Sequence, residues 1–350
     1  MKRFFPSLVK APPRGRRRCL AGLLCLWLLL FSGCAQAPAD ADLKIGVSVY
    51  KGDDTFISSM MDHFRQTAAD YEAKTGERIN LTFADANESQ STQNSQIERF
   101  LSLGYDVLCV NLVDRTDAGS VIDKAREAGV PVVFFNREPV QEDMQKWDRI
   151  VYVGSDARES ARLEAQIVID AYESSPGRID SNGDGVIQYV MLEGERRHQD
   201  AIIRTEVSVE TLRAAGLAVE KLDGGIANWD RDQAAALAEE YFNTYGNGVE
   251  LILCNNDDMA LGAADASDKL GMAFHNIVGI DGTAEGMTAV RGRRILGTVV
   301  MDVPAHAEAI FLTAYAFATG ADPAESLSAE GYTLDADRSV RVPMHMQKAD

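Results

Sequence analysis

Residues 107–135, VLCVNLVDRTDAGSVIDKAREAGVPVVFF, contain one complete repeat of the alternation that decides the fold. The stretch begins with the apolar run 107–110 and ends with a second apolar run at 130–135. Both runs are rich in valine, and the second ends in two phenylalanines; both residue types favour strands. The longer segment between them has a helical pattern. A strand, a helix and a second strand in this order predict neighbouring parallel strands.

The same alternation extends in both directions. Apolar runs at 45–49, 79–83 and 150–153 complete a first series with the two runs above. A second series of apolar runs occupies 186–192, 217–222, 251–254, 277–280 and 295–300. Helical patterns are expected near 158–172, 201–214, 231–245, 259–270 and 284–290. Nearly continuous apolar strands that alternate with helices belong to parallel sheets covered on both faces. We therefore predict an α/β protein with two doubly wound parallel-sheet lobes, whose ligands bind at the carboxyl ends of the strands.

The loop 180–188, DSNGDGVIQ, presents an oxygen ligand at every second position. Positions one, three, five, seven and nine of a calcium-binding loop supply ligands, and here they hold Asp180, Asn182, Asp184, Val186 through its carbonyl, and Gln188. Gly185 occupies position six, where such loops turn sharply. Position twelve is Met191, a poor ligand for a hard cation, so a Ca²⁺ site here needs a carboxylate from elsewhere. A plain Asx/Gly turn before a strand is the alternative.

The N-terminus predicts export. Seven basic residues precede an uncharged apolar run at 19–31, which is shorter than the roughly 20 residues of a membrane span. The sequence that ends in Ser32, Gly33 and Cys34 resembles the bacterial lipobox, in which the cysteine becomes the lipid-modified N-terminus. We therefore predict a lipoprotein signal peptide at 1–33, lipidation of Cys34 and a short tether over 34–42. The protein would be extracytoplasmic, held at the outer face of the cell membrane by lipid alone or lying in the periplasm.

Charge and cysteine content narrow the partners. Without residues 1–33 the chain has 28 basic and 53 acidic residues, a net charge of −25. Nucleic acid and anionic lipid surfaces are therefore poor partners. Cys109 and Cys254 each stand near the end of an apolar run, and we predict that both are buried and unpaired.

Polar residues follow the predicted strands at the edge where ligands bind. This set consists of Asp53, Asp54, Asn136, Arg137, Glu138, Asn255, Asn256, Asp257 and Asp281, joined by His198, Asp200 and Arg204 beyond the run at 186–192. Phe56 and Trp229 add two aromatic rings. Carboxylates and amides hydrogen-bond to hydroxyls, and aromatic rings cover the C–H faces of a pyranose, so the set indicates a sugar site. Taken singly, each polar residue is an ordinary cap or turn residue.

Four motifs resemble one family closely: IGVSVYKGDDTF (45–56), NLVDRTDAGSVIDKAREAGVPVVFFNREP (111–139), VYVGSDARES (151–160) and DSNGDGVIQYVMLEGE (180–195). The family is that of bacterial D-galactose/D-glucose-binding proteins, type I periplasmic binding proteins that feed ABC importers. The resemblance covers residues 43–343. It implies two lobes joined by a hinge of three crossings, near 153–156, 300–302 and Asp335. The N-terminal lobe would comprise 43–153 with 302–336, and the C-terminal lobe 154–301 with 337–350.

The resemblance also implies site residues. The family's sugar contacts match Asp54, Asn136, His198, Asp200, Arg204, Asn256 and Asp281, with Phe56 and Trp229 as the stacking pair. Its calcium ligands match the five loop positions and Glu250, which supplies the carboxylate that the loop lacks. Met301 departs from the family, which has a sugar-binding asparagine there. The resemblance therefore implies D-glucose or D-galactose as the ligand, and Met301 leaves a different monosaccharide open.

Binding by hinge closure is the expected mechanism, because sugar would contact both lobes only in the closed form. A monomeric, sugar-loaded protein would then be recognised by an ABC transporter permease. The alternative partner is a chemoreceptor or a two-component kinase that senses sugar. An enzyme is disfavoured, because the chain has no G-x-S-x-G or HExxH motif and its five histidines lack metal-ligand spacing. A transcription regulator of this fold would need a DNA-binding module where the signal peptide stands.

Overall fold

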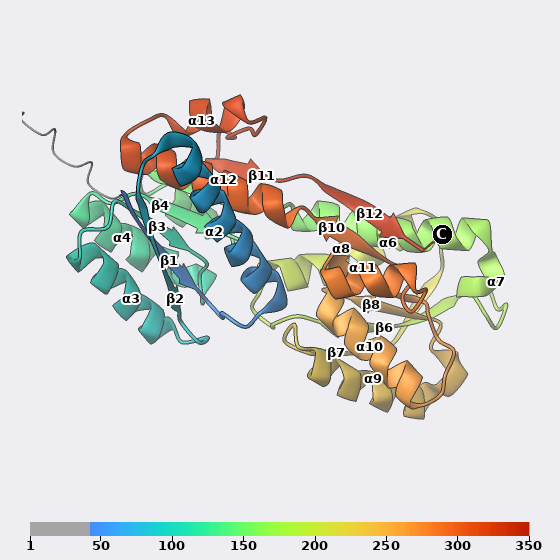
Figure 1. Ribbon diagram of the computed structural model, residues 1–350. Coiled ribbons are helices and arrows are strands. Elements are labelled where there is room, and N and C mark those ends of the chain that lie inside the picture. The colour runs from blue at the N-terminus through green and yellow to red at the C-terminus, as the bar shows by residue number, and fades with distance from the viewer. Residues whose placement is uncertain (1–42, 350) are drawn as a thin grey trace, which may run out of the picture. The chain divides into compact units, whose positions relative to one another are not determined.

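The computed structural model of the chain describes residues 43–349 (Figure 1). The predicted signal peptide, the tether and Cys34 lie outside the described residues. Two six-stranded sheets organise the described part, as the two series of apolar runs predict. We call the sheet that contains β1, with its helices, the first lobe, and the other sheet with its helices the second lobe.

The first sheet is entirely parallel, with strand order β11-β5-β4-β3-β1-β2. Its strands are β1 (Leu43–Val49), β2 (Ile79–Asp85), β3 (Val107–Val110), β4 (Val132–Phe135), β5 (Ile150–Gly154) and β11 (Ser339–Arg341). The helices of this lobe are α2 (Thr55–Thr75), α3 (Gln90–Ser102), η1 (Arg115–Asp117), α4 (Ala118–Ala128), α5 (Gln141–Met144), α12 (Val303–Thr319) and α13 (Pro323–Ala329).

The second sheet has the order β12-β10-β9-β8-β6-β7, and only its edge strand β12 runs antiparallel. Its strands are β6 (Ile187–Glu193), β7 (Val219–Ile226), β8 (Leu251–Cys254), β9 (Ile277–Asp281), β10 (Gly297–Met301) and β12 (Met344–Lys348). The helices are α6 (Ala157–Ser174), α7 (Pro176–Ile179), α8 (Gln199–Ala214), α9 (Arg231–Tyr245), η2 (Gly246–Gly248), α10 (Asp257–Lys269) and α11 (Ala284–Arg291).

Burial on both faces explains why the central strands are apolar along their whole length. Every residue of β3 and β4 is buried, as is every residue of β8 and β9. On one face of the first sheet α2 and α12 lie side by side (Figure 1), and the other face packs against α3 and α4. Cys109 and Cys254 are buried and unpaired, each within the core of its lobe.

The chain crosses between the sheets three times, and the predicted position of the third crossing is wrong. The first crossing lies between β5 and α6, and the second lies between β10 and α12. We expected the third near Asp335, with 337–350 in the second lobe. Instead β11 pairs with β5, Val340 lies opposite Val153 and is fully buried, so the chain crosses only at Val342 and Pro343. This three-residue strand is too short to give an apolar run of its own.

A polar contact ties the three crossings together. Ser155 follows β5, and its Oγ lies 2.8 Å from Nε2 of His306 in α12 and 3.4 Å from the carbonyl oxygen of Val342. His306 Nδ1 lies 2.7 Å from the carbonyl oxygen of Asp302, to which it donates, so Nε2 accepts from Ser155. Ser155, at the first crossing, thus contacts both His306, beside the second crossing, and Val342, at the third.

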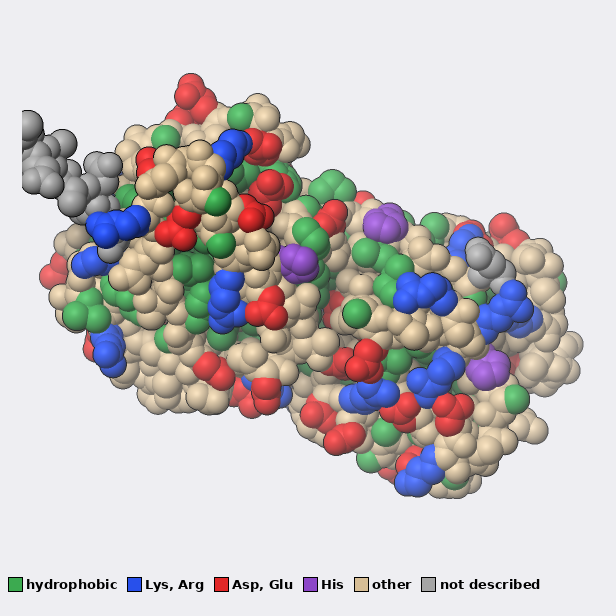
Figure 2. All heavy atoms as spheres, viewed as in Figure 1, with side chains coloured by type: hydrophobic (Ala, Val, Ile, Leu, Met, Phe, Trp, Pro, Cys, Tyr) green, Lys and Arg blue, Asp and Glu red, His purple; other side chains and the backbone are tan. Residues whose placement is uncertain are grey.

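On the face visible in Figure 2, acidic and basic side chains are interspersed and form no large basic area. Within residues 43–349, no helix has both the length and the apolar character that crossing a membrane requires.

Candidate ligand-binding site

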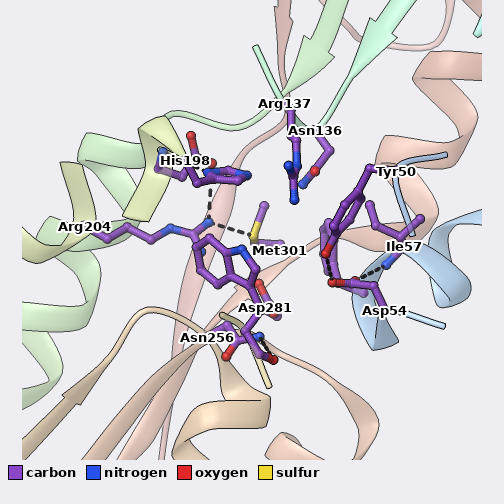
Figure 3. A pocket seen from close by; sticks show the side chains of 13 residues that line it. Tyr50, Asp54, Ile57, Asn136, Arg137, His198, Arg204, Asn256, Asp281 and Met301 are labelled. Atoms are coloured by element: carbon purple, nitrogen blue, oxygen red, sulfur yellow. Dashed lines mark hydrogen bonds and ion pairs between the residues drawn. The ribbon is translucent and has the colours of Figure 1, made fainter. Parts of the chain in front are cut away.

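A pocket of about 410 Å³ lies between residues that follow strands of both sheets (Figure 3). The nine residues that we expected to contact sugar, and Met301 as the tenth site position, all line it. The complete lining is Tyr50, Asp54, Phe56, Ile57, Asn136, Arg137, His198, Asp200, Arg204, Trp229, Asn256, Asp281 and Met301.

Helix capping fixes the position of Asp54 on the first-lobe side. Asp54 is the N-cap of α2, and its Oδ1 accepts a hydrogen bond of 2.9 Å from the backbone N–H of Ile57. Its Oδ2 accepts a hydrogen bond of 2.5 Å from the hydroxyl of Tyr50. Both carboxylate oxygens therefore have protein donors, and the lone pairs that remain on them face the pocket.

A left-handed backbone conformation places Asn136 at the end of β4. Asn136 has a φ of 62°, which asparagine tolerates better than most residues. Its Oδ1 accepts a hydrogen bond of 3.0 Å from the side-chain amide of Asn111, and its carbonyl oxygen accepts one of 2.9 Å from Tyr152. With its oxygen engaged in this way, the side-chain amide group of Asn136 is left to donate into the pocket.

On the second-lobe side, the start of α8 supplies His198 and Asp200. His198 is the N-cap, and its Nδ1 accepts a hydrogen bond of 3.1 Å from the backbone N–H of Asp200. Burial, with the nearby Arg137 and Arg204, lowers the pKa of His198 well below its usual range, so the ring is neutral. The proton is then on Nε2, which makes this atom a hydrogen-bond donor for a ligand.

Arg204 is buried in the wall of the pocket, and each of its three side-chain nitrogen atoms lies near a protein acceptor. Its Nε donates to Ser160 Oγ at 3.2 Å, and its Nη1 donates to the carbonyl oxygen of Asn255 at 2.7 Å. Its Nη2 lies 3.6 Å from the sulfur of Met301 and 3.8 Å from Oδ2 of Asp200. The Met301 sulfur is a weak hydrogen-bond acceptor. It takes the place beside Arg204 Nη2 that a stronger oxygen acceptor could otherwise hold.

An unusual backbone conformation and a neighbouring glycine together determine the position of Trp229. Its φ of 62° is rare for a bulky side chain. Gly194, just after β6, lies directly against the indole, because a Cβ on Gly194 would be 2.2 Å from Cζ2 of Trp229. The ring also packs edge-on against His198, with centroids 4.9 Å apart. Asn256, the N-cap of α10, lies beside it and donates to its carbonyl oxygen at 3.5 Å.

Asp281 brings a buried carboxyl to the end of β9. Burial raises its pKa well above the usual range, while the positive charge of Arg204 opposes this and the negative charge of Asp257 adds to it. Within the described part of the chain the Asp281 side chain accepts no hydrogen bond from protein, and Figure 3 shows it at the floor of the pocket. It is therefore available to a ligand hydroxyl.

Three lining residues were not among the expected contacts. Tyr50 and Ile57 flank Asp54, and Arg137 follows Asn136. The guanidinium carbon of Arg137 lies 3.7 Å from the centre of the Tyr50 ring, and Nη2 donates to Glu195 Oε1 at 2.6 Å. Arg137 belongs to the same run of polar residues as Asn136, so the sequence indicated that it lies near the end of the strand. Nothing in the sequence indicated that it would join the two lobes.

The structure brings the six expected calcium ligands to one loop. Glu250, just before β8, is buried, and its Oε1 accepts hydrogen bonds from the backbone N–H groups of Ser181 (2.7 Å) and Asn182 (3.0 Å). Asp180 accepts from the N–H groups of Gly183 and Gly185 at 2.8 and 3.0 Å.

The donor set of this loop suits a hard cation, although its acids do not form a cluster by themselves. All six candidate ligands offer oxygen, as Ca²⁺ prefers. Among residues 43–349, no three acidic, histidine or cysteine side chains gather closely enough to hold a metal without other ligands. The amide groups of Asn182 and Gln188 instead complete the loop, donating to Gln188 Oε1 and Asp184 Oδ2 at 2.9 and 3.0 Å. An ion would have to replace these two hydrogen bonds.

Comparison with known proteins identifies relatives along most of the chain. Residues 45–322 match the family described as the periplasmic binding protein domain. A D-galactose/methyl-galactoside binding periplasmic protein of Haemophilus influenzae is 35% identical over 89% of this chain and 91% of its own length. A xylitol-binding protein of Mycolicibacterium smegmatis is 28% identical over 83% of this chain and 76% of its own length. Among solved structures, an ABC transporter solute binding protein from Bacillus halodurans with bound myo-inositol superimposes with a TM-score of 0.71 at 25% identity, covering 89% of this chain and 96% of that one.

Proposed function

Because the chain belongs to the family of periplasmic binding proteins, we propose that it binds D-glucose or D-galactose between its two lobes and delivers the sugar to an ABC transporter permease. Members of this family are extracytoplasmic substrate-binding proteins of transporters, so the chain is a binding protein and not an enzyme. The observation that carries the proposal is the gathering of the nine expected sugar contacts, with Met301, around one pocket.

The chemistry of the pocket supports a hexose. Carboxylates of Asp54, Asp200 and Asp281 are acceptors for hydroxyl groups, while Arg204 and the Nε2–H of His198 are donors. Phe56 and Trp229 add two apolar rings to the same lining. Many polar groups that converge on a small volume, with flat apolar surfaces among them, match a ligand with hydroxyls at its edge and C–H groups on its faces.

Closure of the two lobes is the proposed mechanism. The first lobe contributes Asp54 and Asn136, and the second contributes His198, Asp200 and Asp281. A sugar that contacts both sets favours the state in which the lobes approach, so ligand shifts the population towards it. The three crossings, joined at Ser155, His306 and Val342, form the hinge. A permease that recognises only the approached state then distinguishes loaded from empty protein, which we propose to act as a monomer.

Calorimetric titration of the purified protein with D-glucose and D-galactose tests this function. Asp54→Asn keeps an N-cap but removes the charge, and we expect it to weaken binding by roughly 5- to 150-fold, the effect of about 1–3 kcal/mol. Asp53→Asn is the matched control, because Asp53 is the exposed neighbour and does not line the pocket. Absence of binding for both sugars, or equal affinities of the two variants, would disprove the proposal.

A second ligand class is favoured by Met301. Its thioether stands where the resembling family has an amide, and it makes that part of the pocket less polar. A monosaccharide or a cyclic polyol that presents a C–H group at this position would suit a less polar wall, and the solved Bacillus halodurans protein has bound myo-inositol. Titration with myo-inositol, D-ribose and xylitol beside the two hexoses separates these ligands, since the tightest one identifies the class.

We also propose that the loop at 180–188 binds a structural Ca²⁺ through Asp180, Asn182, Asp184, the Val186 carbonyl, Gln188 and Glu250. The supporting observation is that Glu250, only 1% exposed, reaches this loop with a carboxylate whose hydrogen-bond partners are backbone and hydroxyl groups of the loop. A buried carboxylate without a cationic partner is costly. A bound cation would stabilise it, and it would tie the loop to β8 at a place that is not part of the sugar pocket.

Cys34, which lies outside the described residues, is proposed as the lipidated N-terminus that anchors the protein outside the cytoplasm. A Cys34→Ser protein expressed in its native envelope should be released by a high-salt wash, and retention would disprove the anchor.

A permease is the proposed partner, because the family feeds importers. Sugar-dependent cross-linking to a chemoreceptor or kinase, and not to a permease, would favour the sensing alternative.

A further inference from the structure

A second pocket, of about 700 Å³, adjoins the sugar pocket and shares Arg137, His198 and Asp200 with it. We propose that this second pocket holds a second hydroxylated unit joined to the hexose, so that the ligands include disaccharides or glycosyl-polyols as well as free monosaccharides. The inference rests on the proposed function, because the first unit is the hexose in the sugar pocket.

The volume argues for a second unit. The second pocket is larger than the pocket that we assign to one hexose, about 700 against 410 Å³. It keeps this volume although the two lobes are already bridged at its wall by the ion pair between Arg137 and Glu195, at 2.6 Å. The space therefore exists beside a contact that holds the lobes together, and by the same measure it exceeds the space that we assign to one hexose.

The lining of the second pocket offers hydrogen-bonding groups that the protein itself does not use. Within residues 43–349, the side chains of Arg197 and Gln199 make no side-chain hydrogen bond, and both line this pocket but not the sugar pocket. On the opposite wall Asp114 uses only Oδ1, which accepts from the N–H and the hydroxyl of Thr116. Val113 adds an apolar surface. Donors, an acceptor and a small apolar surface again fit a ligand with hydroxyls and C–H faces.

Arg137 marks the boundary where a linked ligand would pass. The residue is 6% exposed, and its Nη1 and Nη2 are held by the Val113 carbonyl oxygen at 2.8 Å and by Glu195 at 2.6 Å. Its Nε is buried and has no hydrogen-bond partner in the described part of the chain. Figure 3 shows the side chain extending into the space between Tyr50 and His198.

Charge disfavours an anionic second unit. The second pocket is lined by five carboxylates, those of Glu88, Asp114, Glu138, Glu195 and Asp200, and by three guanidinium groups, those of Arg115, Arg137 and Arg197. Two of the guanidinium groups are also engaged, since Arg137 binds Glu195 and Arg115 binds the carbonyl oxygens of Glu138 and Pro139. Glu138 and Glu88 also pair with Arg341 and Lys51, at 2.6 and 3.9 Å. These pairings leave no excess of positive charge for a phosphorylated or carboxylated group, so a neutral, hydroxylated unit is the class that fits.

Calorimetry with paired ligands tests the inference on the purified protein. The ligands are D-galactose and D-glucose, and lactose, melibiose and galactosyl-glycerol as extended forms. Two variants alter only the second pocket: Gln199→Trp fills it, and Arg197→Ala with Gln199→Ala removes its unused groups. Arg196→Ala is the control, because Arg196 is an exposed neighbour that lines neither pocket.

We expect wild type to bind at least one extended ligand within about tenfold of the free hexose, and Gln199→Trp to weaken that ligand by about tenfold or more. Hexose affinity should stay within about threefold in both variants. Binding of hexoses without any extended ligand would overturn the inference and leave the proposed function standing. Equal losses for hexose and extended ligand in Gln199→Trp would also overturn it. Absence of binding by every ligand would overturn the proposed function itself, and this inference with it.

Discussion

Glu164 is a buried carboxyl with no hydrogen-bond partner. It lies on α6, it is 1% exposed, and neither of its side-chain oxygens has a partner within the described residues. Burial raises its pKa well above the usual value of 4.5, and the positive charge of Arg204 and the nearby backbone N–H of Cys254 oppose this shift without cancelling it. The folded state therefore holds this proton more tightly than the unfolded state does, and stability falls as pH rises from about 4.5 towards the raised pKa.

We predict that Glu164→Gln melts at a higher temperature than wild type at neutral pH, by about 2 °C for each kcal/mol gained. The difference should shrink as pH falls below the usual glutamate pKa, because wild type is then protonated in both states. Thermal melts between acidic and neutral pH measure it. Glu173→Gln, which changes an exposed glutamate of the same helix, should show no such trend. A Glu164→Gln advantage that does not depend on pH would contradict this explanation.

Met301 is the residue on which we propose that sugar specificity depends. Its sulfur lies 3.6 Å from Arg204 Nη2, at a buried position in the wall of the pocket. We predict that Met301→Asn strengthens glucose or galactose binding by roughly 5- to 150-fold, the effect of about 1–3 kcal/mol for a restored hydrogen bond. Met301→Leu separates the amide from the loss of sulfur and should not strengthen binding. Tight binding of another monosaccharide by wild type, with no gain in Met301→Asn, would show a changed specificity.

At the scale of single elements, the turn after β6 controls the aromatic wall of the pocket. Gly194 leaves no room for a side chain beneath Trp229, since the added Cβ would lie 2.2 Å from the indole. We predict that Gly194→Ala displaces the ring, shifts the emission of Trp229 and weakens hexose binding by about tenfold or more. Fluorescence and calorimetry measure both effects. At Gly177, in α7, the same change meets no atom within 4 Å and should leave both properties unchanged. If Gly194→Ala changes neither the fluorescence emission nor the hexose affinity, Trp229 does not contact the bound hexose.

The loop before β6 is the second element with a testable role. If Ca²⁺ binds there, chelation should lower the melting temperature, because an ion that binds only the folded state stabilises it by about 2.7 kcal/mol at 100 times its Kd. We predict that Glu250→Gln loses most of the difference between melts in calcium and in chelator. Glu220→Gln, an exposed change on β7, should keep it. The calcium proposal fails if wild type melts at the same temperature in both conditions.

Across the whole molecule, the contact between Arg137 and Glu195 joins the first lobe to the second. Glu195→Gln should weaken hexose binding, by up to about tenfold, because the approached state of the lobes loses an ion pair that is partly shielded from water. Glu193→Gln breaks an ion pair with Lys221 inside the second lobe and should have no effect on binding. Titration calorimetry compares them, and equal affinities would show that the contact does not favour closure.

Both sheets could be predicted from the sequence wherever a strand is covered on two sides. β3 and β8 begin and end at the predicted residues, because all four residues of each are buried and apolar. The two strands at the C-terminus gave no such signal. β11 has three residues, and β12 has a single buried residue, Met344, followed by partly or fully exposed positions at the edge of its sheet. Neither strand contains a continuous apolar run, so a search for such runs misses both.

The pocket was more predictable than the hinge, because the carboxyl ends of parallel strands meet at one edge. Asp54, Asn256 and His198 cap helices there, and caps are visible in a sequence. Whether Tyr50 or Arg137 points into the pocket depends on backbone angles and on packing across the lobes. The left-handed backbone of Trp229 has no sequence signal either, since few bulky residues adopt it.

The late position of β11 and β12 has a consequence for biosynthesis. Both sheets take an edge strand from the short segment Ser339–Lys348. Neither sheet can therefore reach its full width until this segment has been synthesised. The two lobes complete their sheets at the same stage, although most of each lobe is made at a different time. A stop codon before residue 339 would damage both lobes at once, because each sheet would lose an edge strand.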